Sequence, residues 1–302
     1  MLAGGTGGAK LAAGMQDLVG EELAVVANTA DDTYALGVHV SPDPDLITYW
    51  LSDQIDEQRG WGIRGDTFTV FERLVELGAP DWFRLSDRDL ATCLRRTEML
   101  VAGARLTDVQ GEIARALGAR ARVLPMSDQP VRTRVRTSEG WRDIQEYLVL
   151  DSAEPAIEEI ALEGASEAAP TPEVTEAIGS ADAIVIGPSN PVISIGPILA
   201  VPGISGAISA SSAPVVAVSP FVAGKAVKGP TEKFMRAIGR EPSAAGVAAT
   251  YEALIDGFVV DASDPEPPPT GTQLLAVPLL MNDAATRREV AQRTLEFARS
   301  LA

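Results

Sequence analysis

The stretch that decides the fold is LAGGTGGAKLAAG, which runs from Leu2 to Gly14. Four glycines occupy the five positions from Gly4 to Gly8, and an apolar helical pattern follows them. Glycine lets the backbone turn sharply and bring N–H groups close to an anion at the start of a helix. The stretch therefore predicts a phosphate-binding turn between a short first strand, residues 1–3, and a helix from Lys10 to Val19.

The spacing of this turn narrows the class of nucleotide site. G-G-T-G-G-A-K does not fully match the dinucleotide fingerprint G-x-G-x-x-G, nor the P-loop, which requires G-K-[ST]. Ordinary dehydrogenase and ATPase sites are therefore disfavoured. A glycine-rich turn can also serve only the tight packing of a helix on a strand, so that alternative stays open.

Beyond the turn, the chain changes its pattern twice. Leu23 to Ala27 reads as a buried strand, residues 45–118 read mainly as helices, and residues 120–162 read as strands. From Thr171 onward, apolar strands again alternate with helices, and PEPPPTG (residues 265–271) reads as a loop.

This order predicts an α/β fold, a doubly wound, mostly parallel Rossmann-like sheet with an inserted, mainly helical cap. We expect a nucleotide-binding α/β domain at residues 1–40 and 163–302. The cap is expected at residues 41–162, with helices at 45–118 and strands at 120–162.

The composition limits the kinds of chemistry. Among the 302 residues, Cys93 is the one cysteine and His39 the one histidine, which excludes an intrachain disulfide and disfavours a zinc site or histidine-based catalysis. Any metal is therefore expected to be a hard ion bound by oxygen atoms, such as Mg²⁺.

The charge balance and hydropathy limit the partners and the location. The net charge of −17 disfavours nucleic acid as a partner, and only four of the 25 basic residues are lysines. No apolar run approaches the length of a membrane span, about 18 residues, and no signal peptide opens the sequence. We therefore expect a cytoplasmic protein with no membrane partner, and the acidic composition leads to the hypothesis of a halophilic, salt-rich cytoplasm.

Four polar or glycine-rich segments follow predicted strands, at residues 4–10, 28–32, 187–191 and 219–230. In open α/β sheets, ligands bind beyond the carboxyl ends of the strands, where such segments converge. Ser189 and Asn190 offer neutral hydrogen bonds there, and Lys225 and Lys228 offer two of the rare cations.

Paired carboxylates also occur at these positions. Asp31 and Asp32 end a predicted strand and could hold Mg²⁺, but they could equally form a turn or a helix cap. Asp43 and Asp45 lie two positions apart before a predicted helix, where Asp45 is also a plausible N-cap.

Together these segments resemble the 2-phospho-L-lactate transferase family of deazaflavin coenzyme (F-420) biosynthesis. The resemblance rests on the following stretches, in order: LAGGTGGAKLAAG, VANTADD, VSPDPDLITYWLSDQID, RGWGIRGDTF, LSDRDLATCLRRTEML, LPMSDQPVRT, IGPSNPVISIGPIL and VVAVSPFVAGKAVKGPTEKFM. It implies transfer of a phospholactyl or phosphoenolpyruvyl group from a guanosine diphosphate conjugate to the ribityl hydroxyl of the deazaflavin Fo, with release of GMP and with Mg²⁺ present.

The resemblance also implies roles for individual residues. Asp45 and Arg88 fall where the family contacts the deazaflavin, and we expect Trp61 beside them. A carboxylate, Asp45 or Asp32, would accept the proton of the attacking hydroxyl, and Mg²⁺ would be held by Asp31, Asp32 and Asp45. The guanosine diphosphate part of the donor would contact Gly4, Gly5, Thr6, Gly7, Gly8, Lys10, Ser189, Asn190, Lys225 and Lys228.

Two departures from the family pattern and one rival function accompany the resemblance. The family has a fuller first strand, so we expect a truncated start, and the usual D-L-D corner reads D-P-D at residues 43–45. The rival is a non-enzymatic, nucleotide-sugar-binding regulator of the gluconeogenesis-factor type, which shares the G-G-T-G loop. We expect the transferase, acting as a homodimer on small-molecule substrates and using the phospholactyl donor.

Overall fold

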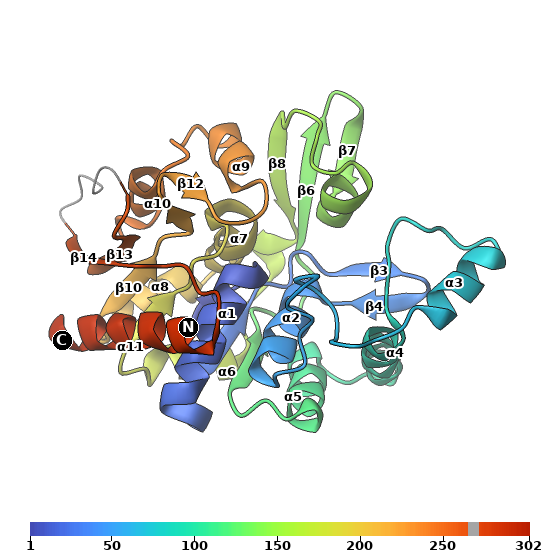
Figure 1. Cartoon of the computed structure of the whole chain (residues 1–302), viewed down its shortest axis with the longest axis horizontal. Helices are drawn as coiled ribbons and strands as arrows, with labels where there is room; N and C mark the ends of the chain where they lie inside the picture. Colours follow the sequence, from blue (N-terminus) through green and yellow to red (C-terminus); the bar gives the residue numbers. More distant parts are fainter. Residues whose placement is uncertain (265–271) are drawn as a thin grey trace.

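A seven-stranded parallel sheet forms the centre of the protein (Figure 1). The computed structural model describes residues 1–264 and 272–302, so the predicted loop at 265–271 lies outside the described residues. The strand order across the sheet is β14 (Gln273–Val277), β13 (Gly257–Asp261), β10 (Val215–Val218), β9 (Ile184–Ile186), β1 (Leu2–Ala3), β2 (Ala24–Ala27) and β5 (Arg122–Pro125).

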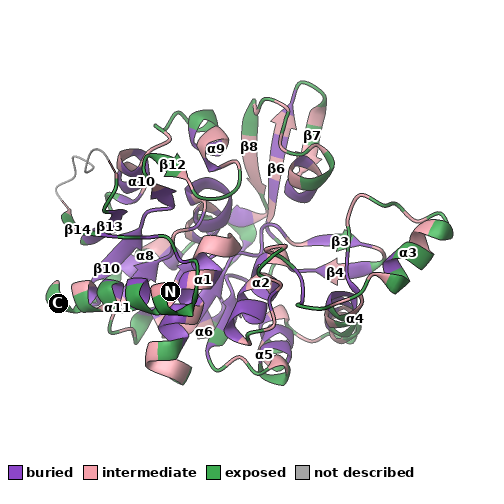
Figure 2. Cartoon of the chain, in the orientation of Figure 1, coloured by how far each residue is buried: buried purple, intermediate pink, exposed green. Residues whose placement is uncertain are grey.

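Helices cover both faces of this sheet, because its strands are apolar on both sides. Val26 packs into the hydrophobic cluster on one face and its neighbour Val25 into the cluster on the other. One face is covered by α1 (Gly5–Val19), α2 (Pro42–Leu51), α5 (Leu106–Leu117) and α11 (Ala284–Ser300). The other is covered by α6 (Pro172–Gly179), α7 (Gly196–Ala200), α8 (Ile204–Ala210), α9 (Thr231–Ala237) and α10 (Ala244–Tyr251). The predicted doubly wound α/β fold is confirmed, and Figure 2 shows the inner strands of the sheet as buried.

The part of the chain predicted as a cap is divided in the structure. β5 pairs with β2 in the main sheet, and α2 packs along α1, so both belong to the central body and the prediction of one insertion over residues 41–162 needs correction there. The physical reason is apolar content: Val123 in β5 and Ile47 in α2 are fully buried in the core of one sheet face.

Two smaller units project from this body (Figure 1). One is formed by the hairpin β3 (Thr33–Ala35) and β4 (Val38–Val40) with α3 (Thr69–Glu76) and α4 (Asp87–Val101). The other is the antiparallel sheet of β6 (Arg132–Thr137), β7 (Gly140–Asp143) and β8 (Glu159–Glu163). A short hairpin of β11 (Phe221–Val222) and β12 (Lys225–Ala226) follows β10.

Three sequence expectations differ in detail. The first helix begins at Gly5 rather than Lys10, because the glycines after Gly4 already form its first turn. The helix expected from residue 45 begins at Pro42. Proline is well suited to the first position of a helix, because the N–H group that it lacks would have no partner within the helix there. The strand expected for WRDIQEYLVL ends at Asp143, and a helical turn follows over Glu146–Leu150.

Among residues 1–264 and 272–302, no single helix is long and apolar enough to cross a membrane. One sharply bent pair, Pro191–Ala200 with Ile204–Ala210, meets that criterion by length and composition alone.

Candidate active site

A cavity of about 490 Å³ lies at the carboxyl ends of the central strands. The four predicted segments converge on it, together with residues after β14. Its lining includes Gly4, Gly5, Thr6, Gly7, Lys10, Asp31, Asp43, Ser189, Asn190, Lys228 and Met281. We call this space the first cavity.

The glycine turn lies against the loop that carries Ser189. The Gly4 N–H donates to Ser189 Oγ at 3.2 Å. A Cβ placed on Gly7 would lie 2.2 Å from the Pro188 carbonyl oxygen, and one on Gly8 would lie 2.4 Å from Ser189 Oγ. Gly5 has φ +59° with open space around it, so it serves the turn and not a close contact. Gly4, Gly5 and Gly7 therefore line the first cavity, whereas Gly8, also expected to contact the donor, packs against Ser189 and does not line it.

Two lysines border the first cavity. Lys228 Nζ donates to Thr6 Oγ1 at 2.9 Å, and Lys10 Nζ donates to the Met281 carbonyl oxygen at 2.8 Å. Partial burial lowers the pKa of both ammonium groups. The positive charge of Arg287 lowers the pKa of Lys10 further, and that of Lys10 lowers the pKa of Lys228 further. Lys225, expected at the same site, is exposed on β12 and does not line the cavity.

Two buried carboxylates, Asp31 and Asp43, face the first cavity together. Asp43 accepts hydrogen bonds from the Gly5 N–H at 2.7 Å and from Asn28 Nδ2 at 2.9 Å. Among the described residues, Asp31 Oδ1 has no hydrogen-bond partner. Burial raises the pKa of both carboxyls, and the charge of Asp43 raises that of Asp31 further. A divalent cation between them would relieve both penalties.

The other predicted metal ligands point elsewhere. Asp32 accepts from Ser41 Oγ at 2.8 Å and lies 3.7 Å from His39 Nε2, outside the first cavity. Asp45 pairs with Arg96. The three carboxylates expected to share a metal therefore do not converge, because Ser41 binds Asp32 and Arg96 binds Asp45 outside the first cavity, which Asp31 lines. Asp43 takes the place beside Asp31.

A second cavity, of about 350 Å³, adjoins the first and shares Asp43 and Gln145 with it. Its lining includes the aromatic side chains of Tyr49, Trp61, Trp82 and Phe83. Asp45 and Asp89 supply carboxylates. Trp61 lines this cavity. Arg88 is exposed and does not line it, whereas its neighbour Asp89 does.

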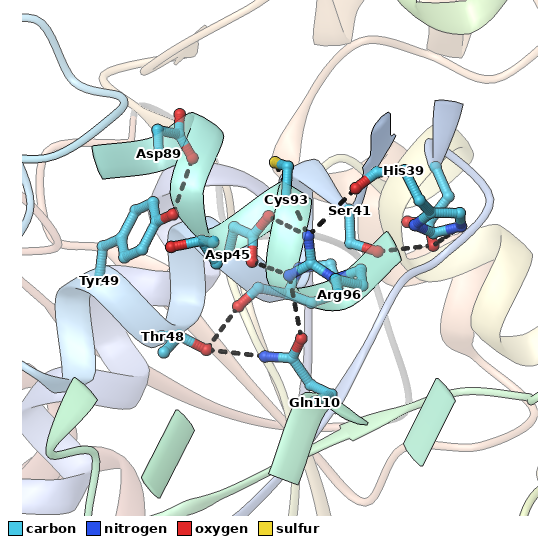
Figure 3. Close-up of polar contacts among 12 residues, drawn as sticks. His39, Ser41, Asp45, Thr48, Tyr49, Asp89, Cys93, Arg96 and Gln110 are labelled. Atoms are coloured by element: carbon cyan, nitrogen blue, oxygen red, sulfur yellow. Dashed lines mark hydrogen bonds and ion pairs between the residues drawn. The ribbon is translucent and has the colours of Figure 1, made fainter. Parts of the chain in front are cut away.

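A buried polar network holds the carboxylates of the second cavity (Figure 3). The Arg96 guanidinium donates to both oxygens of Asp45, with Nη1 to Oδ2 at 3.0 Å, and Tyr49 Oη donates to Asp89 at 2.7 Å. Burial raises the pKa of Asp89 to about 7, and the charge of Asp45 contributes. Sequence reasoning missed Tyr49, Asp89 and Arg96, since no local pattern sets them apart from other helical residues.

The fold and these adjoining cavities define a Rossmann-like α/β protein with two neighbouring ligand cavities at the carboxyl ends of its strands. Comparison with known proteins gives the family. The family model described as "2-phospho-L-lactate transferase CofD" matches residues 1–277 of the chain. The chain belongs to the CofD 2-phospho-L-lactate transferase family.

Individual relatives carry two different names. A "2-phospho-L-lactate transferase" of Methanosarcina mazei is 43% identical over 265 residues, covering 87% of each chain. A "Phosphoenolpyruvate transferase" of Kitasatospora aureofaciens is 43% identical over 309 residues, covering 98% of this chain and 96% of that one. A solved Bacillus halodurans structure of the UPF0052 family shares the fold, with a TM-score of 0.65, 18% identity and 97% coverage of each chain.

Proposed function

We propose that the protein transfers a 2-phospho-L-lactyl group from lactyl-2-diphospho-5'-guanosine to Fo, 7,8-didemethyl-8-hydroxy-5-deazariboflavin, giving coenzyme F-420-0 and GMP. The observation that carries this proposal is the joining of the two cavities at Asp43 and Gln145. The first offers glycine N–H groups, lysines and paired carboxylates to a diphosphate, and the second offers aromatic walls to a deazaflavin ring.

The reaction needs alignment and charge neutralisation more than covalent catalysis. The ribityl hydroxyl oxygen of Fo bonds to the phosphorus of the phospholactyl group, the phosphorus–oxygen bond to the guanosine phosphate breaks, and GMP leaves with that electron pair. Asp45 lines the acceptor cavity and is our choice for the residue that accepts the hydroxyl proton. Asp32 lines neither cavity, so we assign it no catalytic role.

Asp31 and Asp43 are the residues that fit Mg²⁺. They are two buried carboxylates on one cavity, and Asp31 retains an unpartnered oxygen among the described residues. When bound there, Mg²⁺ would neutralise charge on the donor phosphates. Lys228 would add a second positive charge at the same cavity.

The experiment is to incubate the protein with Fo and each guanosine conjugate, with and without Mg²⁺, and to measure GMP. The Kitasatospora relative, which covers nearly the whole chain, favours the enolpyruvyl donor as the second candidate. The two donors differ at one small group, so we expect a phospholactyl preference of about 10- to 200-fold in kcat/KM. A preference of more than about 10-fold for the enolpyruvyl donor would reverse the assignment, and absence of GMP with both would favour the regulator.

Further properties expected from the sequence stay proposals. The net charge of −17 supports a salt-adapted protein, whose free energy of unfolding should rise between about 0.2 and 3 M KCl. A flat or falling curve would contradict salt adaptation. The homodimer is tested by sedimentation and the cytoplasmic location by cell fractionation.

A further inference from the structure

A short segment after β7, residues 145–155, forms part of the boundary between the two cavities. Gln145 lines both cavities, Leu148 lines the first and Val149 lines the second. Gln145 is buried, and its amide can donate and accept hydrogen bonds at the place where the two cavities meet. The position of this segment therefore affects how a ligand in one cavity is aligned with a ligand in the other.

The end of the segment has a backbone conformation that needs support from outside. The helical turn Glu146–Leu150 is followed by Ser152 at φ +52° and Ala153 at φ +53°. Residues other than glycine rarely adopt such positive φ angles, and these angles persist where surrounding contacts hold them. We therefore expect the segment to shift when its contacts with the rest of the protein are removed.

Lys233 of α9 supplies such a contact. Its ammonium group donates to the carbonyl oxygens of Ala153 at 2.5 Å, Glu154 at 2.8 Å and Pro155 at 3.2 Å. An ammonium group has three N–H donors, so these three carbonyl groups match all of them. Figure 1 shows α9 beside the small antiparallel sheet from which the segment leads. Lys233 thus ties the segment to α9.

The start of α9 has anchors of its own on the donor side. Thr231, the first residue of α9, lines the first cavity and accepts from Asn190 Nδ2 at 3.4 Å. Phe234, next to Lys233, is fully buried and packs edge-on against Tyr147, with 5.9 Å between the ring centres. Loss of the Lys233 contacts would therefore loosen the end of the segment, while α9 and the first cavity keep their places.

We propose that Lys233 is a positioning residue for the transfer reaction, which holds Gln145 at the junction of the two cavities. Lys233 itself lines neither cavity, so it acts through the segment. The inference rests on the proposed function, which brings the ribityl hydroxyl of Fo to the phosphorus of the donor. A misplacement of about 1 Å in such an alignment can lower the rate about 100-fold.

The test combines steady-state kinetics for Fo with calorimetric binding of GDP to the full-length protein, with Mg²⁺ present. Lys233→Met should lower kcat/KM for Fo by about 10- to 100-fold and leave the GDP affinity unchanged. Gln145→Ala should cause a similar loss, and the double variant should lose little more, because the two residues act as a unit. An unchanged kcat/KM, additive losses, or an equal fall in GDP affinity would overturn this role of Lys233.

A control and a rescue separate the ammonium group from general damage to α9. Arg236 lies on the same helix and pairs with Glu232 at 3.1 Å on the surface, so Arg236→Met should keep the wild-type kinetics. Lys233→Cys alkylated with 2-bromoethylamine regains an ammonium group on a side chain of lysine length, and Cys93 is fully buried. The alkylated protein should recover most of the lost kcat/KM, and no recovery would contradict the proposal.

Hydrogen exchange gives a readout that does not depend on the reaction. The Ala153 N–H donates to the Tyr147 carbonyl oxygen at 2.8 Å, and the Asp151 N–H to that of Glu146 at 2.9 Å. Both amides should exchange faster in Lys233→Met than in the wild type or in Arg236→Met. Equal exchange rates would overturn the role of Lys233 while GMP formation still supports the transferase. Faster exchange without any GMP formation by the wild type would instead overturn the proposed function.

Discussion

Replacing Arg96 with methionine should destabilise the protein severely, because it removes one partner of a buried ion pair. Arg96 is 0% exposed and Asp45 is 4% exposed, so water cannot take over the lost contact. Breaking such a pair costs about 3–5 kcal/mol of unfolding free energy. For a chain of 302 residues, that corresponds to a fall in melting temperature of roughly 5–8 °C.

The neighbouring residue supplies a matched control. Arg95 pairs with Glu98 and Glu112 on the surface, where exposed pairs contribute at most about 1 kcal/mol. Arg95→Met should therefore change the melting temperature little. Adding Asp45→Asn to Arg96→Met should recover part of the loss, because the unpaired charge is then gone. Thermal unfolding at pH 7 measures all four proteins. If the two single variants melt together, or if Asp45→Asn recovers nothing, the pair does not stabilise the fold as argued.

Three further predictions concern the loop, the single histidine and the aromatic cavity. Gly7→Ala should abolish GDP binding, because its Cβ would meet the Pro188 carbonyl oxygen, whereas binding at the wild-type affinity would refute that packing. Burial lowers the pKa of His39 to about 4, so native stability is lost as pH falls below about 6.5, by up to about 3 kcal/mol. His39→Gln should flatten that fall in urea unfolding, and parallel curves would contradict it. Fo should quench tryptophan fluorescence through Trp61, and Trp61→Phe should reduce the quench; an unchanged wild-type spectrum would exclude this placement.

The sequence predicted the central sheet well because the signals there are local. The glycines at positions 4, 5, 7 and 8 mark the change from strand to helix, where Gly5 takes a positive φ, and buried strands such as β10 read as unbroken apolar runs. The extent of the cap was harder to predict. β5 pairs with β2, which lies about a hundred residues earlier in the chain, and not with a separate sheet. Periodicity shows the strand but not its partner.

The candidate site was likewise predictable only in part. Convergence of the loops could be predicted, because the carboxyl ends of parallel strands meet at one edge. The directions in which Asp43 and Asp45 point could not be predicted from the sequence. The two residues lie two positions apart on α2, yet the Asp43 carboxylate accepts from the Gly5 N–H and the Asp45 carboxylate pairs with Arg96. The pattern D-P-D shows that two carboxylates are present, but the residues that contact each carboxylate in the folded protein determine which cavity it faces.

The second cavity is built almost entirely from one continuous piece of chain. From Val40 to Asp89 the sequence supplies nearly all of its lining, with Gln145 and Val149 as additions, whereas the first cavity draws on loops from Gly4 to Asn282. In the proposed function, the acceptor side of the reaction is thus built from one segment of the chain and the donor side from many. Recombination that exchanges a single gene segment could give a relative a new acceptor while its donor chemistry is inherited intact.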